Sequence, residues 1–325
     1  MSLDTVRLGN TGLQVSEIAL GTARFGSTRD DGTEEIDKET AHELLNTYAD
    51  RGGNFIDLAD AYGGGLAETY VGEWLCDRDR EEFVLASKIY WPTHESDPNS
   101  SGLNRKHLRR QVDRILDRLG TDYLDLLYIH RWDNETPVEE FMRTLDQFVS
   151  EGRVHYLGAS NGEPNAWQVV KANEAARRFG YEQFTNLQFK YNLIDRELER
   201  NVIPMAQDYG LGVIPFSPLA GGFLTGKYQR GEEPPPDSRV AREERYYEDY
   251  FTKNSFDILE RVEAVAAECD GSVIQVSLAW LLKHPDVTSP IIGPRSVSQL
   301  ESNLDSVDLT ITDNQFEQLK RARSA

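Results

Sequence analysis

The chain has 325 residues, of which 39% are hydrophobic and 10% aromatic, and a formal net charge of −20. This length allows one large domain or two ordinary ones, and the apolar content is sufficient for a substantial core. So negative a charge excludes a general affinity for nucleic acid or for anionic lipid. No apolar run has the length of a membrane span, and the N-terminus lacks a signal-peptide pattern, so we expect no membrane partner.

The two cysteines, Cys76 and Cys269, lie far apart without metal-type spacing, and we interpret them as free thiols in a reducing cytoplasm. Arginine far outnumbers lysine. An acidic surface poor in lysine is typical of halophilic proteins, in which high salt screens the repulsion. A GC-rich genome that favours arginine codons would give the same composition, so both interpretations stay open.

In chain order, a short hairpin signal at 6–16 precedes eight short apolar runs that resemble buried strands. These runs are 16–25, 54–59, 83–90, 124–132, 154–161, 184–192, 212–219 and 289–296. Between them lie stretches with apolar residues at helical spacing, such as 104–120 and 137–152. Several of these stretches end in glycine, as a helix C-cap prefers: Gly120, Gly152, Gly180 and Gly210.

Strands that alternate with helices predict right-handed βαβ units, and eight evenly spaced strands predict an α/β fold of the (β/α)8 TIM barrel type, with residues 1–325 as one domain. A doubly wound sheet is the alternative, but it would carry G-x-G-x-x-G directly after an early strand. Gly63-Gly64-Gly65 lacks that spacing. The longest insertion, 223–255, follows the seventh strand, and its prolines and charges predict a long loop over the barrel mouth.

Polar residues interrupt the apolar runs at the C-terminal strand ends, where catalytic residues of such barrels cluster. Asp57, Lys88 and His130 lie toward the ends of the second, third and fourth runs, and Tyr62 comes five residues after Asp57. Taken singly, the lysine could reach solvent, the histidine could be a hydrogen-bonded core residue, the aspartate could cap a helix and the tyrosine could be a packed ring. Three ionisable groups on three adjacent strands at one rim favour a catalytic site.

These residues suit carbonyl chemistry. A partly buried Lys88 requires a counter-ion, which Asp57 supplies. The ammonium is expected to lower the pKa of Tyr62, so that the phenol can give a proton to a carbonyl oxygen while His130 donates or orients a hydrogen bond there. No nucleophile–base pair and no cluster with metal-ligand spacing stands out in the sequence. Proton donation without a nucleophile or a metal indicates hydride transfer from a cofactor.

Asp57, Tyr62, Lys88 and His130 resemble the catalytic tetrad of the aldo-keto reductases, and the similarity runs from LGNTGLQVSEIALGT through IIGPRSVSQLESNL. The resemblance implies a (β/α)8 barrel that binds NADP(H) across its rim without a Rossmann motif, with NAD(H) as a weaker alternative. It also implies that Tyr62 is the general acid and that Lys88 and Asp57 lower its pKa. The HRWD, FKYN and PLAGG segments are similar to the bacterial and potassium-channel β-subunit branch.

The resemblance further implies which residues bind the cofactor. Those at the nicotinamide are Ser160, Asn161, Gln188 and, stacked on the ring, Phe216. Those that wrap the pyrophosphate are Ser217, Leu219, Gly222, Lys227 and, with a weaker match, Arg239. Those at the adenosine phosphate are Gly293, Arg295, Gln299 and Asn303. An arginine at a helix N-terminus suits a 2′-phosphate, because the guanidinium fork and the backbone N–H groups both favour an anion.

Tyr90, Trp91 and Trp132 are expected to line the substrate pocket, with a structural role as the alternative for each. The favoured function is an NADP-dependent reductase of aldehydes or ketones whose partner is a small carbonyl compound. The alternative is a nucleotide-sensing regulatory subunit with incidental turnover, and an intact tetrad does not separate the two because channel subunits retain it. The physiological substrate, the strictness of the NADP preference and the oligomeric state stay open.

Overall fold

Eight parallel strands form the centre of the molecule in one curled sheet, with the spatial order β10-β3-β4-β5-β6-β7-β8-β9. The computed structural model describes residues 2–29, 32–94, 96–161, 165–236 and 238–321. The strands of the sheet are β3 (Ala19–Gly21), β4 (Phe55–Asp57), β5 (Val84–Ile89), β6 (Leu124–Ile129), β7 (Val154–Asn161), β8 (Phe184–Phe189), β9 (Gly212–Val213) and β10 (Ile291–Ile292). Each strand lies within one of the eight predicted runs.

The two outermost strands of this order, β9 and β10, are joined by backbone hydrogen bonds between the segments that contain them. The N–H of Thr288 donates to the carbonyl of Val213 at 2.7 Å, and the N–H of Ile291 donates to that of Pro215 at 2.8 Å. These bonds bring the ends of the sheet together. The predicted (β/α)8 barrel is therefore confirmed.

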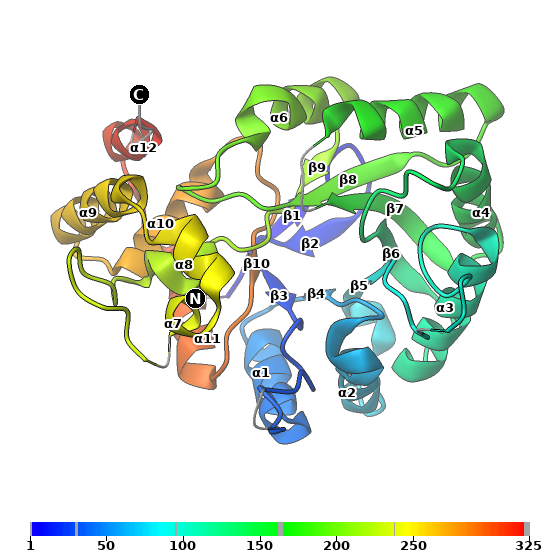
Figure 1. The fold of residues 1–325 in the computed structure, drawn as a ribbon, viewed down its shortest axis with the longest axis horizontal. Coiled ribbons are helices and arrows are strands. Elements are labelled where there is room, and N and C mark those ends of the chain that lie inside the picture. The colour runs from blue at the N-terminus through cyan, green and yellow to red at the C-terminus, as the bar shows by residue number, and fades with distance from the viewer. Residues whose placement is uncertain (1, 30–31, 95, 162–164, 237, 322–325) are drawn as a thin grey trace.

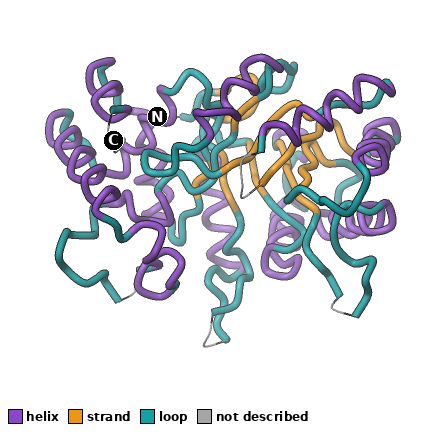
Figure 2. Tube along the Cα trace, turned by 45° about the horizontal axis from the view of Figure 1, so that its top comes forward, coloured by secondary structure: helices purple, strands orange, loops and turns teal. Residues whose placement is uncertain are grey.

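Helices surround the strands on the outside. In Figure 1, α1 to α6 run around the strands from the bottom through the right side to the top, and Figure 2 shows the helices outside the strands. The α-helices are α1 (Lys38–Asp50), α2 (Leu66–Leu75), α3 (Arg105–Leu119), α4 (Val138–Ser150), α5 (Ala166–Phe179), α6 (Leu198–Tyr209), α7 (Arg239–Arg242), α8 (Glu244–Tyr250), α9 (Lys253–Glu268), α10 (Val273–Lys283), α11 (Val297–Leu304) and α12 (Asp313–Lys320). Short 3-10 helices are η1 (Tyr62–Gly65), η2 (Arg80–Glu82), η3 (Ala220–Thr225) and η4 (Asp305–Asp308).

Three of the four glycines predicted to end helices are C-cap residues, and the fourth lies one residue after the C-cap. Gly120, Gly180 and Gly210 are the C-cap residues of α3, α5 and α6, with left-handed backbone angles. The C-cap of α4 is Glu151, and Gly152 follows it with a φ of 72°. Because residues with a Cβ rarely adopt this conformation, the glycines let the chain leave each helix and turn toward the next strand.

The N-terminal hairpin is also confirmed. Strand β1 (Thr5–Arg7) pairs antiparallel with β2 (Gln14–Ser16), with Val6 opposite Val15. Leu8 and Val15 are fully buried and pack in one cluster with barrel side chains such as Phe55. The hairpin thereby covers apolar side chains of the barrel interior.

Strand side chains alternate between the barrel interior and the helix layer. Phe55, Val84 and Leu126 belong to the cluster inside the barrel, whereas Ile56 and Leu85 belong to the core between strands and helices. Because the period is two residues, the polar side chains that continue an inward-facing row also point into the barrel at its C-terminal end.

The insertion at 223–255, predicted as a loop, is partly helical. It contains α7, α8 and the first turn of α9, and Ser238 and Thr252 cap α7 and α9 with their side chains. Aromatic residues hold it in place: the ring of Phe223 stacks on that of Tyr228 with centroids 5.1 Å apart and meets that of Phe256 at 5.2 Å. Packing among these rings holds the insertion against the barrel, although its prolines and charges predict a loop.

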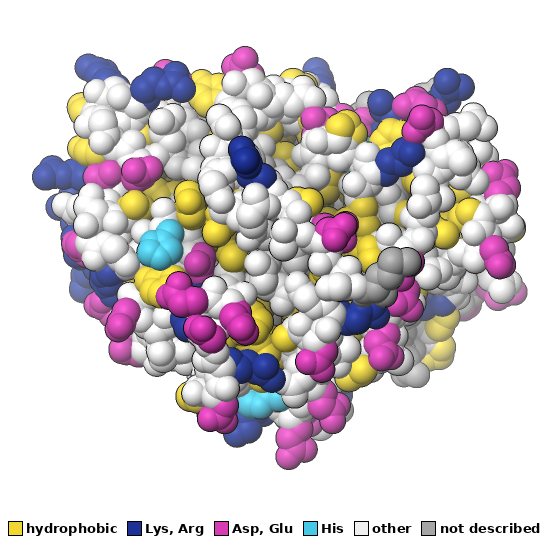
Figure 3. Space-filling view, turned by 180° about the vertical axis from the view of Figure 1, so that it is seen from behind, with side chains coloured by type: hydrophobic (Ala, Val, Ile, Leu, Met, Phe, Trp, Pro, Cys, Tyr) yellow, Lys and Arg dark blue, Asp and Glu magenta, His cyan; other side chains and the backbone are white. Residues whose placement is uncertain are grey.

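Acidic side chains are spread over the surface and interspersed with basic ones, as the face in Figure 3 shows. Some acidic residues are adjacent in the sequence, as in Glu34-Glu35 and Glu243-Glu244. One carboxylate of each of these two pairs has a basic partner: Glu35 pairs with Arg24, and Glu243 pairs with Arg239 at 2.8 Å. The pair Asp30-Asp31 lies outside the described residues. The chain nevertheless has 55 acidic residues against 35 lysines and arginines, so 20 carboxylates are in excess.

We expect salt to stabilise the fold, because self-repulsion on so acidic a chain opposes the compact state. Screening shortens the reach of that repulsion from about 30 Å at 0.01 M salt to about 3 Å at 1 M. Thermal unfolding followed from about 0.05 M to about 3 M KCl should show a rising melting temperature. The same scan in sucrose of equal osmolality separates screening from solute exclusion, and a flat or falling curve in KCl would contradict a halophilic protein.

Cys76 and Cys269 are both free thiols, as expected from their separation in the sequence. Among the described residues, no single helix is both long and apolar enough to cross a bilayer. The helices α9 and α10 reach the required length and composition only when taken together across a bend of 94°.

Candidate active site

The structure brings the four predicted catalytic residues together at the C-terminal end of the barrel. Asp57 is the last residue of β4 and continues the inward row of Phe55, while Lys88 continues the inward row of Val84 on β5. The N–H of His130, directly after β6, donates to the carbonyl of Ile89 at 3.0 Å. The regular pleat of adjacent parallel strands thus places these side chains at one rim.

Lys88 is the centre of the polar contacts at this rim. Its side chain is fully buried, and its ammonium donates to Asp57 Oδ2 at 2.8 Å, to the carbonyl of Leu58 at 2.7 Å and to the hydroxyl of Tyr62 at 3.1 Å. The other carboxylate oxygen of Asp57 accepts a hydrogen bond from Nε2 of Gln188 at 2.7 Å. Every donor of the ammonium is used, so its position is fixed.

The three glycines after Tyr62 explain how the phenol reaches this ammonium. Gly63, Gly64 and Gly65 have φ values of 57°, 66° and 101°, all in the left-handed range. A Cβ on Gly63 would lie 2.4 Å from the carbonyl oxygen of Phe25, so a side chain has no space there. The glycine run lets the chain turn directly into α2 and leaves the tyrosine at the mouth.

Burial controls the protonation of these groups. It lowers the pKa of Lys88, but the negative charge of Asp57 and the Tyr62 oxygen outweigh it and raise that pKa above its ordinary value. Burial raises the pKa of Tyr62, Lys88 opposes the rise, and the charge of Asp57 adds to it. Lys88 thus lowers the tyrosine pKa as expected, but the expectation that Asp57 also lowers it is wrong, and the cost of burying a phenolate leaves the pKa above its ordinary value.

His130 is a neutral imidazole. Burial and the nearby Lys88 ammonium lower its pKa to about 3. Its ring lies edge-on to that of Tyr62, with centroids 5.8 Å apart, and its buried Nδ1 has no hydrogen-bond partner among the described residues. A neutral imidazole beside a neutral phenol gives the site two uncharged hydrogen-bonding groups at one point.

Two further buried carboxyl groups lie close enough to the Lys88 ammonium to be influenced by its charge, and neither was predicted from the sequence. Glu68 is fully buried and accepts hydrogen bonds from Ser87 Oγ at 2.5 Å and Arg118 Nε at 2.7 Å. Asp60 is 4% exposed, and neither of its oxygens has a partner among the described residues. Burial and the charge of Glu68 raise the pKa of Asp60 to about 8, so this carboxyl is largely neutral at pH 7.

The three aromatic residues predicted to line the substrate pocket separate into two groups. Trp91 is 39% exposed, and its ring centroid lies 6.0 Å from that of His130, while the ring of Tyr90 meets that of Trp91 edge-on at 5.4 Å. Trp132 is 8% exposed and packs edge-on against Phe141 of α4 at 5.5 Å. The first two are therefore placed beside the predicted catalytic residues, whereas the ring contacts of the third are with the helix layer.

The residues predicted at the nicotinamide lie on neighbouring strands. Ser160 on β7 is opposite Gln188 on β8, and both are buried. Phe216 follows β9, and its N–H donates to the carbonyl of Phe189 at 2.9 Å. Asn161 ends β7, but its side chain lies outside the described residues. These strands thus carry a row of amide, hydroxyl and aromatic groups beside Asp57.

The segment predicted to wrap a pyrophosphate has an unusual backbone. Ser217 and Ala220 have positive φ values of 54° and 50°, and Gly222 has one of 95°. Such angles on residues with a Cβ cost on the order of 1–3 kcal/mol each and concentrate at functional sites. A Cβ on Gly222 would lie 3.6 Å from Nζ of Lys227, so the lysine stands directly over this turn. Leu219, the residue before Ala220, is partly buried against the core.

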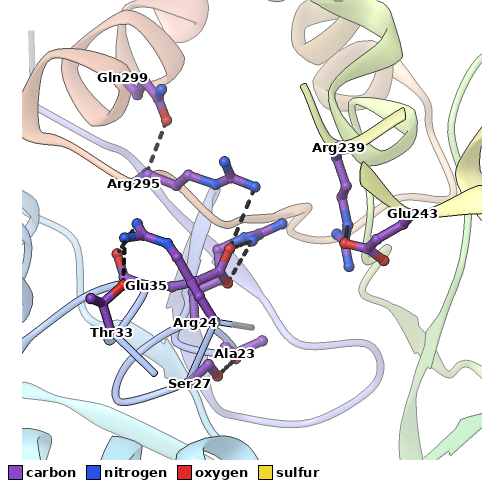
Figure 4. A network of polar contacts seen from close by, with 10 residues as sticks. Ala23, Arg24, Ser27, Thr33, Glu35, Arg239, Glu243, Arg295 and Gln299 are labelled. Carbon is purple, nitrogen blue, oxygen red and sulfur yellow. Dashed lines mark hydrogen bonds and ion pairs between the residues drawn. The ribbon is translucent and has the colours of Figure 1, made fainter. Parts of the chain in front are cut away.

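Beyond this segment lies a cation cluster, which consists of Arg24, Lys227, Arg239, Arg242 and Arg295. Arg295 stands opposite Arg239 in Figure 4, with Arg24 below. Burial and the charges of Arg24, Arg242 and Arg239 lower the pKa of Arg295 to about 10. Partial burial and the charges of Arg295, Arg242 and Arg24 likewise lower the pKa of Lys227. On a chain of charge −20, these crowded cations form a locally positive region, which attracts anions.

Helix α11 carries the other residues predicted at the adenosine phosphate. Oε1 of Gln299 accepts a hydrogen bond from the backbone N–H of Arg295 at 2.9 Å, and Ser296 caps the helix. Gly293 is exposed, and a Cβ there would meet no atom within 4 Å. Asn303 is 6% exposed near the end of the helix.

Sequence reasoning missed two of these cations, Arg24 and Arg242. Arg24 comes three residues after β3, in GTARF, and this rim position was the one signal that could have identified it. Arg242 is the last residue of the four-residue helix α7, inside the insertion predicted as a loop. Within the described residues, no group of three or more His, Cys, Asp or Glu side chains could hold a metal ion.

Comparison with known proteins agrees with this geometry. The sequence profile of the Aldo/keto reductase family matches residues 17–324. The chain is 36% identical over 315 residues to the uncharacterized oxidoreductase YrpG of Bacillus subtilis, which covers 94% of this chain and 91% of that protein. It is 34% identical over 319 residues to norsolorinic acid reductase B of Dothistroma septosporum, with 95% of this chain and 79% of that protein covered. It is 33% identical over 317 residues to an aryl-alcohol dehydrogenase of Pestalotiopsis microspora, again with 95% and 79% covered. The barrel, the residues at its rim and these relatives lead to one conclusion: the chain belongs to the Aldo/keto reductase family.

Proposed function

We propose that this protein is an NADPH-dependent reductase of aldehydes or ketones, located in the cytoplasm, with Tyr62 as the general acid. The observation that carries the proposal is the ammonium of Lys88, which donates both to the carboxylate of Asp57 and to the hydroxyl of Tyr62. A buried ion pair that contacts a phenol at the barrel mouth serves no evident packing purpose, because an apolar residue of similar volume would fill the space at lower desolvation cost.

The residues of the chain can stabilise the negative charge that develops on a carbonyl oxygen as it is reduced. Tyr62 is protonated at working pH because burial raises its pKa, so it retains the proton that the oxygen must receive. Lys88 stabilises the phenolate that remains after the transfer, and Asp57 keeps the lysine charged. The neutral His130 is placed to donate a second hydrogen bond to the same oxygen.

The chain also fits the dinucleotide that this chemistry requires. Ser160, Gln188 and Phe216 would hold the nicotinamide end, whereas Lys227 and Arg295 belong to a cation cluster suited to the phosphates. NADPH would supply the hydride. The left-handed turn at Gly222 leaves the backbone without a side chain next to Lys227, as a phosphate-wrapping segment requires.

We further propose an aromatic carbonyl compound as the preferred substrate. Trp91 and Tyr90 form an aromatic wall beside His130, and an aryl ring can stack on such a wall. One of the relatives above is named as an aryl-alcohol dehydrogenase. Steady-state rates over a panel of aryl aldehydes, sugars and methylglyoxal, each with NADPH and with NADH, test both proposals. Aryl aldehydes with NADPH should give the highest kcat/KM. If no compound of the panel is turned over, the proposal that the protein is a carbonyl reductase is contradicted.

Arg295→Ala should weaken NADPH binding by about tenfold to a hundredfold and hardly change NADH binding, because a charge-assisted contact to a 2′-phosphate is lost. Fluorescence titration with both cofactors measures the two constants. The matched control is Arg245→Ala, the same change on α8 at a side chain that is 84% exposed. Equal losses for both cofactors would show that Arg295 does not read the 2′-phosphate.

A further inference from the structure

The cation cluster at the predicted phosphate site already contains an anion of the chain itself. Both carboxylate oxygens of Glu35 accept hydrogen bonds from Nη1 of Arg24, at 2.6 and 2.7 Å. Nη2 of Arg295 lies 3.7 Å from one of the same oxygens. Figure 4 shows this carboxylate between the two guanidinium groups, one from the segment after β3 and one from the segment before α11.

The backbone holds Glu35 in this place. Its N–H donates to the carbonyl of Ser27 at 2.7 Å, and its own carbonyl accepts from Nη2 of Arg29 at 3.1 Å. The next residue, Ile36, is 2% exposed, and its carbonyl accepts from the N–H of Gly26 at 2.8 Å. The carboxylate is therefore presented to the cluster by a pinned loop, and the exposed fraction of its side chain is only 17%.

The charges explain why a carboxylate is useful there. Burial and the charge of Arg239 lower the pKa of Arg24, and burial and neighbouring guanidinium groups lower the pKa of Arg295. These cations repel one another when no anion is present. One carboxylate between two guanidinium groups stabilises the cluster, and it has the same charge sign and hydrogen-bond geometry as two oxygens of a phosphate.

We propose that the Glu35 carboxylate occupies the place of the 2′-phosphate of the dinucleotide and must leave Arg24 and Arg295 when that phosphate binds. The inference rests on the proposed NADPH-dependent function, and it adds a residue that limits the preference for NADPH over NADH. A 2′-phosphate has to displace a bound carboxylate, whereas a 2′-hydroxyl leaves the carboxylate in place. Glu35 thus reduces the advantage that Arg295 gives to NADPH.

Binding of cofactor fragments tests this without turnover. Isothermal titration calorimetry of the full chain with 2′,5′-ADP and with 5′-ADP gives a ratio of dissociation constants that reports the 2′-phosphate alone. Glu35→Gln removes the charge and keeps the side-chain length, so we expect binding of 2′,5′-ADP to tighten by about tenfold or more, with a much smaller change for 5′-ADP. Glu35→Asp, which withdraws the carboxylate by one methylene, should change the ratio in the same direction by a smaller factor.

The matched control is Glu34→Gln, an identical change of charge one residue earlier. Glu34 is exposed, and its carboxylate accepts from the hydroxyl of Tyr70 at 2.9 Å instead of joining the cluster. This variant should leave the ratio unchanged, whereas an equal effect in E34Q and E35Q would reduce the role of Glu35 to net charge and overturn the proposal.

The outcomes separate the inference from the proposed function. If the wild-type protein binds both fragments and E35Q leaves the ratio unchanged or weakens 2′,5′-ADP, the role of Glu35 is overturned while the cofactor assignment stands. If neither fragment binds to the wild type or to E35Q, both are overturned. Binding of 2′,5′-ADP that appears only in E35Q would support the inference directly.

Discussion

Replacing Tyr62 by phenylalanine should lower the rate of carbonyl reduction by about two to four orders of magnitude, the usual contribution of a general acid. The change removes one oxygen atom and retains the ring, so the shape of the mouth is preserved. It leaves Lys88 with two of its three acceptors, Asp57 and the carbonyl of Leu58. We therefore expect the folded protein and its NADPH affinity to be nearly unchanged while kcat falls.

Tyr90→Phe is the matched control, because Tyr90 is a second partly buried tyrosine near the mouth and is not a partner of the Lys88 ammonium. Single-turnover rates with saturating NADPH measure the chemical step in both variants. Turnover of Tyr62→Phe close to that of the wild type would contradict the assignment of the acid. A fall of equal size in Tyr90→Phe would indicate that the rate depends on polar groups at the mouth in general and not on Tyr62 as the acid.

The barrel could be predicted from the sequence because each βα unit carries its own local signals. The apolar runs, the helical spacing and the glycine at the end of a helix all act within about twenty residues. The closure of the sheet is different, since it depends on strands of two residues, Gly212–Val213 and Ile291–Ile292, and on backbone bonds between segments distant in sequence. Only the count of eight units predicted it.

The predicted catalytic residues were readable because polar side chains interrupt otherwise apolar rows. Asp57 and Lys88 continue rows of residues that face the barrel interior, and a charge in such a row is conspicuous. Their electrostatics could not be read in the same way. The pKa of Tyr62 rises because its hydroxyl is desolvated, and desolvation depends on how distant segments pack around it.

The buried positions of Glu68 near the Lys88 ammonium and of Glu35 among the arginines could not be predicted, because they too depend on how distant segments pack. Glu68 reads as an ordinary acidic residue in the first turn of α2, yet it is fully buried against Ser87 and Arg118. Glu35 reads as a surface residue in an acidic loop, yet it pairs with Arg24 across an intervening turn. Such pairs are set by loop conformation and long-range packing, which leave little periodic signal in the sequence.

Lys88→Met should reduce turnover about as strongly as Tyr62→Phe, because a phenolate left by proton transfer would face no cation. Unlike the tyrosine change, it should also destabilise the fold, by about 3–5 kcal/mol, since the Asp57 carboxylate would stay buried without its ion-pair partner. Chemical denaturation measures this loss. The double variant Asp57→Asn, Lys88→Met removes both charges, keeps an acceptor for the Gln188 amide, and should recover most of the stability while remaining inactive. Stability that returns without activity would show that the ion pair serves catalysis, whereas turnover by either variant at the wild-type rate would refute a role for Lys88 in the proton transfer.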